Sequence, residues 1–117
     1  MIRNYPWIQD KWVVSIWFNT RYKLFASGSG VHISNKYGEW IKQESLPPKF
    51  SESISGEANN NVFVVGDFSL VSHYNGMSWN VYDEIPVGRY ISNSYKNGIM
   101  VATGDVGSKA IILTMKR

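Results

Sequence analysis

Three glycines spaced by a constant interval constrain this chain more than any other feature. Gly28, Gly66 and Gly104 are each 38 residues from the next. Three such periods cover nearly all of the 117 residues, so each residue must be judged against its counterparts one period away. Each glycine ends a short apolar run: Leu24–Gly28, Val62–Gly66 and Ile99–Gly104.

The region around each glycine predicts short strands. Segments 15–28, 53–66 and 91–104 align without a gap. Asn75-Gly76, between two apolar runs, is a strong hairpin signal. No stretch holds an apolar period of 3.6 residues, so essentially no helix is expected. The second unit divides into four expected strands: Ser53–Glu57, Val62–Gly66, Leu70–Tyr74 and Trp79–Glu84.

Four strands in each repeat of about 40 residues are typical of a β-propeller. The predicted class is therefore all-β, with four-stranded antiparallel blades. The run Val62-Phe63-Val64-Val65 is apolar at successive positions, which indicates a strand covered on both faces by neighbouring blades. We expect residues 1–117 to form one partial propeller with blade units at about 11–48, 49–88 and 89–117.

The repeat resembles that of bacterial β-propellers of the Asp-box and photosystem-assembly-factor-like group. The resemblance covers about the whole chain. It implies a propeller fold and suggests an extracytoplasmic location, but it says little about function, since this fold carries many unrelated activities. The resemblance is carried by Val62–Asp67, His73–Gly76, Trp79 and Ala110–Arg117. The segment Ser34–Trp40 also resembles a degenerate Asp-box, with Lys36 at the aspartate position.

The two chain ends predict how the blades close. The third unit holds only three expected strands, whereas residues 4–9 resemble residues 75–80, a turn followed by a Trp-led outer strand. A strand at 3–10 would complete the last blade of a partner, or of the same ring. Three blades are below the usual range for propellers, and an open arc would expose two apolar faces. We therefore expect a homodimer with six blades; a larger propeller or more copies are alternatives.

Composition excludes several classes of protein. The chain has no cysteine, so disulfides and thiolate metal sites are excluded. The formal net charge is only +3 and no run of Lys or Arg exceeds two, which makes nucleic acid an unlikely partner. No apolar stretch approaches the length of a membrane-spanning helix, and Met1–Trp7 has no signal-peptide core. No cofactor motif is present.

A basic residue followed by an aromatic one precedes each inner strand. In propellers this connection lies on the same face as the loops that hold Ser29, Asp67 and Asp105. The side chains could form a ring of cations and aromatic groups that binds an anionic or sugar-like ligand. Alternatively, the aromatic rings wedge between blades and the cations are solvated. The pairs are Lys11-Trp12, Lys49-Phe50 and Arg89-Tyr90.

Other polar and aromatic side chains have a structural and a functional interpretation. Asp67 and Asp105 either bind a ligand or hydrogen-bond backbone amides in their turns. The repeated tryptophans either stack on sugars or anchor packing. His32 and His73 lack a second ligand at metal-like spacing, so no metal site is predicted.

The leading functional hypothesis is a non-enzymatic scaffold or binding module that self-associates into a ring, with a glycan, a peptide or another protein as further partner. No nucleophile, base and orienting group form a recognisable motif, so no catalytic residue is assigned. A lectin-like module that binds a glycan or anion at the channel mouth is the first alternative. A degenerate sialidase-like glycosidase is the second, because Asp-box repeats occur in such enzymes.

Overall fold

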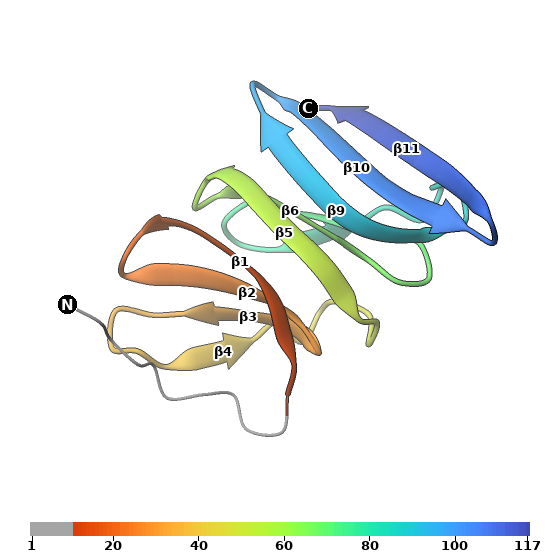
Figure 1. The fold of residues 1–117 in the computed structure, drawn as a ribbon. Helices are drawn as coiled ribbons and strands as arrows, with labels where there is room; N and C mark the ends of the chain where they lie inside the picture. The colour runs from red at the N-terminus through yellow and green to blue at the C-terminus, as the bar shows by residue number, and fades with distance from the viewer. Residues whose placement is uncertain (1–10) are drawn as a thin grey trace.

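The computed structural model describes residues 11–117, and these form three antiparallel sheets with no helix (Figure 1). The first sheet has the order β1-β2-β3-β4, the middle sheet β5-β6-β7-β8, and the third sheet β11-β10-β9. The all-β prediction is confirmed for this part of the chain. The strands are β1 (Val13–Thr20), β2 (Lys23–Gly28), β3 (Gly30–Ser34), β4 (Trp40–Lys42), β5 (Ser51–Ala58), β6 (Asn61–Gly66), β7 (Leu70–Tyr74), β8 (Trp79–Val81), β9 (Arg89–Lys96), β10 (Ile99–Val106) and β11 (Lys109–Lys116).

The second unit folds as the four strands predicted, with different bounds at three of them; β6 begins one residue earlier, at Asn61. Strand β5 begins at Ser51 rather than Ser53, and β8 ends at Val81 rather than Glu84. The amide of Tyr82 still donates to the carbonyl of Val71 at 3.0 Å, and the chain then leaves the sheet toward Pro86. The predicted strand at 3–10 lies outside the described residues.

The sheets follow one another in chain order, and their first strands lie side by side. Strand β5 packs beside both β1 and β9, as Figure 1 shows. The middle sheet is therefore covered on both faces. Val62 and Val64 contribute to a core shared with the first sheet, whereas Phe63 and Val65 contribute to a core shared with the third. This confirms that the strand of the Val62–Val65 run is covered on both faces, since every one of these side chains is fully buried.

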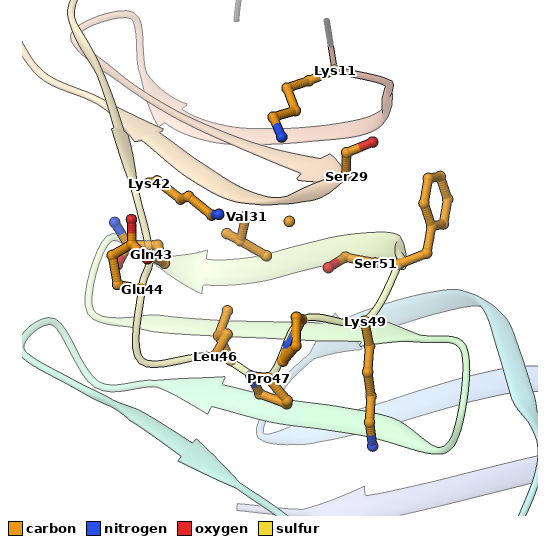
Figure 2. A pocket seen from close by; sticks show the side chains of 13 residues that line it. Lys11, Ser29, Val31, Lys42, Gln43, Glu44, Leu46, Pro47, Lys49 and Ser51 are labelled. Carbon is orange, nitrogen blue, oxygen red and sulfur yellow. The ribbon is translucent and has the colours of Figure 1, made fainter.

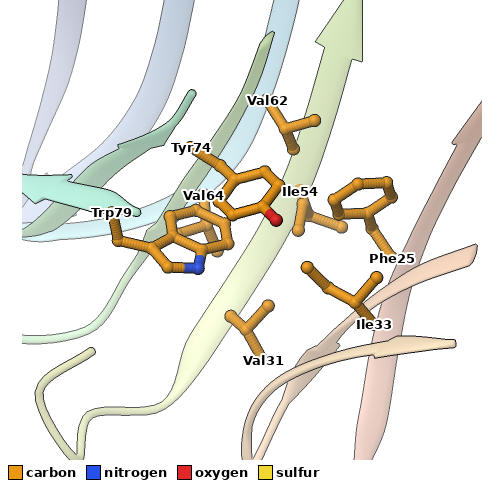
Figure 3. Packing of buried hydrophobic residues seen from close by; sticks show 8 residues of the cluster. All are labelled: Phe25, Val31, Ile33, Ile54, Val62, Val64, Tyr74 and Trp79. Atoms are coloured by element: carbon orange, nitrogen blue, oxygen red, sulfur yellow. The ribbon is translucent and has the colours of Figure 1, made fainter. Parts of the chain in front are cut away.

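Each core combines aliphatic and aromatic side chains from facing sheets. In the first core, Phe25 of β2 meets Tyr74 of β7 edge-on, with ring centroids 5.9 Å apart (Figure 3). In the second core, the ring of Phe63 meets that of Tyr95 of β9, with centroids 4.9 Å apart and planes at 86°. Edge-on ring pairs of this kind add to the stabilisation from buried area.

The repeated glycines have a common cause in the packing of the backbone. A Cβ built on Gly28, Gly66 or Gly104 would overlap the carbonyl oxygen of Trp12, Phe50 or Arg89, respectively. Each of these carbonyls belongs to the residue that leads into, or begins, the first strand of the sheet. Only glycine lets the second strand approach that carbonyl so closely.

The first hairpin of the third unit is one residue shorter, although the turns of all three hairpins hold two residues. Ser51 lies opposite Gly66, fifteen positions on, but Tyr90 lies opposite Gly104, fourteen positions on. The first two hairpins have a register irregularity beside the turn, and the third has none there. Its turn is Asn97-Gly98, both with positive φ, a tight two-residue connection. The ungapped alignment of 91–104 is therefore wrong by one position within β9.

Candidate functional site

The entries to the first strands lie beside the loops that join the second and third strands, on one face of the molecule. The amide of Trp12 donates to Ser29 Oγ at 3.1 Å, and the amide of Asp67 donates to the Phe50 carbonyl at 2.9 Å. Arg89 pairs with Asp105 at 3.2 Å. Trp12 and Phe50 thus contact the loop of their own unit, whereas Arg89 contacts Asp105, which lies within β10 rather than in the loop predicted for it.

A cavity of about 360 Å³ opens on this face between the first and middle sheets (Figure 2). The ammonium groups of Lys11 and Lys42 extend into it, and Glu44 supplies the one carboxylate of its wall. Its lining comes from the start of β1, the β2–β3 loop and the segment from β4 to β5: Lys11, Ser29, Gly30, Val31, Lys42, Gln43, Glu44, Leu46, Pro47, Pro48, Lys49, Phe50 and Ser51.

Lys49 lines the cavity but its ammonium group points away, as Figure 2 shows. Its Nζ donates to the carbonyl oxygen of Phe68 at 2.9 Å, in the β6–β7 loop. The lysine therefore ties the chain between the first two sheets to that loop. Of the three lysines in the wall, Lys11 and Lys42 remain for a ligand.

The pKa of the buried His32 is influenced by the positive charge at this cavity. Burial lowers the pKa of His32, and the nearby ammonium groups of Lys42 and Lys11 lower it further, against a smaller opposite effect of Glu44. The imidazole is therefore neutral at neutral pH. With Lys49 turned away, the cavity holds the ammonium groups of Lys11 and Lys42 against the one carboxylate of Glu44, a balance that favours an anion.

A second cavity of about 330 Å³ occupies the matching position between the middle and third sheets. Its charged groups are Asp67, Arg89 and Asp105, and apolar side chains such as Phe68 and Val106 lie beside them. Burial raises the pKa of nearby Glu52, as do its hydrogen bond to Asp67 and the charge of that carboxylate, whereas Arg89 lowers it. The two cavities therefore differ in charge although they repeat in place.

The third basic–aromatic pair does not match the first two. Arg89 holds the register position of Trp12 and Phe50, and Tyr90 enters the second core with no exposed surface. The Tyr90 hydroxyl donates to the carbonyl of Pro86 at 2.7 Å. The prediction of a matched ring is wrong at this pair, because the shorter third hairpin shifts β9 by one residue. Trp12 is 75% exposed and Phe50 half-buried.

Trp79 and His73 are explained by packing. The Trp79 indole N–H donates to Gln43 Oε1 at 3.0 Å, and its ring lies 4.9 Å from that of Tyr74. His73 Nε2 lies 2.6 Å from Asn61 Oδ1, which also accepts from the Tyr95 hydroxyl. Because an amide oxygen accepts, Nε2 of His73 carries the proton.

We expect the stability of the protein to fall as the pH decreases from 6.5 to about 4. Burial, followed by the charge of Arg117, lowers the pKa of His73 to about 4. The unfolded chain binds a proton near pH 6.5, whereas the folded chain binds it only near pH 4, so the free energy of unfolding falls by about 3 kcal/mol over this window. Urea denaturation at a series of pH values measures it. His73→Gln keeps a donor but does not titrate, and an equally steep profile for that variant would contradict the assignment.

Sequence reasoning missed Lys42 and Glu44. Lys42 ends the short strand β4 and Glu44 follows it, and the chain from there to β5 lines the cavity at the end of the first sheet. A third cavity of about 570 Å³, lined by Tyr22, Lys23 and Tyr74 among others, was also not predicted. There Lys23 Nζ lies 5.9 Å from the Tyr74 ring centroid. The Pro47-Pro48 dipeptide, which forces an extended chain, was the available signal for the first cavity.

The chain matches no known protein family and no curated protein sequence. Within residues 11–117, no cluster of three or more His, Asp or Glu side chains could hold a metal ion. The same residues contain no helix of the length and apolarity needed to cross a membrane.

Proposed function

We propose that the chain is a non-enzymatic binding scaffold whose three sheets are blades of a β-propeller, and that two chains close a six-bladed ring. The blades are the first, middle and third sheets, related by the 38-residue repeat. The third sheet has one strand fewer than the other two, and a strand at 3–10 of the partner is the proposed fourth.

The exposed apolar character of the two end sheets carries this proposal. Strand β1 alternates, with Trp17 packed on the first core and Val14, Ile16 and Phe18 directed away from it and exposed. On the third sheet, Val101 and Ile112 are likewise exposed on the face turned away from the core. Two such faces on one chain favour association, because apolar surface remains in water otherwise.

Light scattering of the intact chain over a range of concentrations tests the assembly. We expect a mass near twice the 13.3 kDa of one chain at micromolar concentration. Because closure buries both end faces, no intermediate mass should accumulate. A stable monomer at these concentrations would rule the proposal out, and a larger closed species would rule out the six-bladed count.

Binding of an anionic glycan at the cavity between the first two sheets is a second candidate function. The observation that favours it is the pair of ammonium groups, Lys11 and Lys42, that extend into a cavity with an excess of lysine. A sialylated trisaccharide is a suitable probe by calorimetry. We expect Lys42→Glu to abolish its binding and Lys109→Glu, an exposed lysine of the β10–β11 hairpin, to leave it unchanged. If the wild-type chain gives no heat of binding with this trisaccharide, glycan binding at the cavity is ruled out.

A further inference from the structure

Neighbouring sheets in this chain are joined by the same hydrogen bond. Ser15 Oγ of β1 accepts from the amide of Ile54 in β5 at 3.1 Å. Ser53 Oγ of β5 accepts from the amide of Asn93 in β9 at 3.0 Å. In both cases a serine on the first strand of one sheet bonds to the backbone of the first strand of the next sheet.

The middle sheet adds a second bond of the same kind to the third. Ser55 Oγ accepts from the amide of Tyr95 at 3.1 Å. In the preceding junction Trp17 takes the place of Ser55 and packs on Gly56, where a Cβ would come 3.1 Å from its ring. The first strand of each sheet is an edge strand, so it has hydrogen-bond partners within the sheet on one side only. These serines accept from backbone amides on the other side, which would otherwise lack a partner in the protein.

Strand register identifies the counterparts of these groups on the two end sheets. Ser15, Ser53 and Ser92 each pair with the residue one before the repeat glycine, so Ser92 is the serine of the third sheet. Ile54 and Asn93 pair with the residue two before the glycine, as Ile16 does in the first sheet. Ser94 corresponds to Ser55, and Phe18 corresponds to Tyr95, by the same criterion.

The apolar side chains on the free face of the third sheet repeat those that are buried elsewhere. Val101 pairs with Ser94 as Phe63 pairs with Ser55, and it is 37% exposed where Phe63 is fully buried. Ile112 holds the position of Val31 and Val71, opposite the residue before the glycine. Ile112 is 73% exposed, whereas Val31 and Val71 are at most 1% exposed.

We infer that the first sheet of a second copy docks on the free face of the third sheet and repeats the junction found within the chain. Ser92 Oγ then accepts from the amide of Ile16 of the second copy, and Ser94 Oγ from that of its Phe18. Val101 and Ile112 are covered by the second copy. The inference builds on the proposed self-association and adds that the contact is head-to-tail, between two different faces, rather than between two identical ones.

Complementation of two blocked variants tests the inference. Ile16→Asp blocks the first sheet and Ile112→Asp blocks the third, and both side chains are exposed, so folding is retained. We expect each variant alone to be monomeric by light scattering, because every junction would contain one blocked face. An equimolar mixture should form a 1:1 dimer through the one junction whose two faces are both intact.

The outcomes separate this inference from the proposed function. If the wild type is dimeric but either blocked variant stays dimeric, or if the mixture stays monomeric at concentrations where the wild type associates fully, the head-to-tail junction is wrong and self-association stands. If the wild type is monomeric, both fail. As an independent measure, Ser92→Ala with Ser94→Ala should weaken wild-type association by roughly tenfold. Ser108→Ala, in the exposed β10–β11 turn, should leave it unchanged.

Discussion

Gly66→Ala should lower the free energy of unfolding by about 3 kcal/mol, the upper part of the range for overpacked sites. The added methyl group would overlap the carbonyl oxygen of Phe50 and lie 2.9 Å from the Cα of Ser51. Both obstacles are backbone atoms, so no side chain can move aside to make room. Relief requires β5 and β6 to separate beside the second core, which weakens packing there as well.

Urea denaturation at fixed protein concentration measures this loss, with Gly38→Ala as the control. Gly38 has no neighbouring atom within 4 Å of a built Cβ, but its φ is +81°. Its substitution therefore costs only the conformational strain of a left-handed residue, about 1 kcal/mol. Equal losses at the two glycines would show that the close approach of Phe50 does not explain the repeat.

Phe63→Ala should destabilise the protein by about 4 kcal/mol, as large-to-small changes at fully buried aromatic positions do. The ring lies at the centre of the second core. Its centroid lies 4.8 Å from that of His73, 4.9 Å from that of Tyr95 and 6.3 Å from that of Tyr82. Truncation leaves a cavity between two sheets, and the rings of His73 and Tyr95 are held by hydrogen bonds to Asn61 that oppose collapse into it.

Phe68→Ala is the matched control for this change. The Phe68 side chain is largely exposed. The hydrogen bond from Lys49 goes to the backbone carbonyl of Phe68, which the substitution keeps. We expect its substitution to change stability by less than about 0.5 kcal/mol. Thermal and urea denaturation of both variants would measure the difference, and comparable effects would contradict the placement of Phe63 in the core.

Structural features that follow from the periodicity of the sequence were predictable, whereas shifts of strand register by a single residue were not. The run Val62–Val65 indicated a strand covered on both faces, because no alternation can remain when both faces are buried. The Arg89-Tyr90 pair was misaligned, because β9 lacks the extra residue that β1 and β5 hold beside the turn. A one-residue shift keeps the strand pattern but turns each side chain to the opposite face. The lysines of the first cavity were partly missed, since Lys42 at the end of β4 faces a cavity only when the segment from Gln43 to Ser51 forms the opposite wall.

The sequence by itself determined the 38-residue repeat, the all-β fold class and the glycine positions at which no side chain fits. These properties are local or periodic: apolar runs, turn residues and a glycine at each close approach of two strands. Only the tertiary structure decided which faces are covered and which remain open. In the sequence Ser92 resembles any other serine, and only the register of β9 makes it the counterpart of Ser15 and Ser53. Ile112 resembles a core residue in the sequence, and only the packing leaves it in solvent. Register and burial depend on contacts between segments about 40 residues apart, such as Ser53 with Asn93, and these form only when the sheets pack.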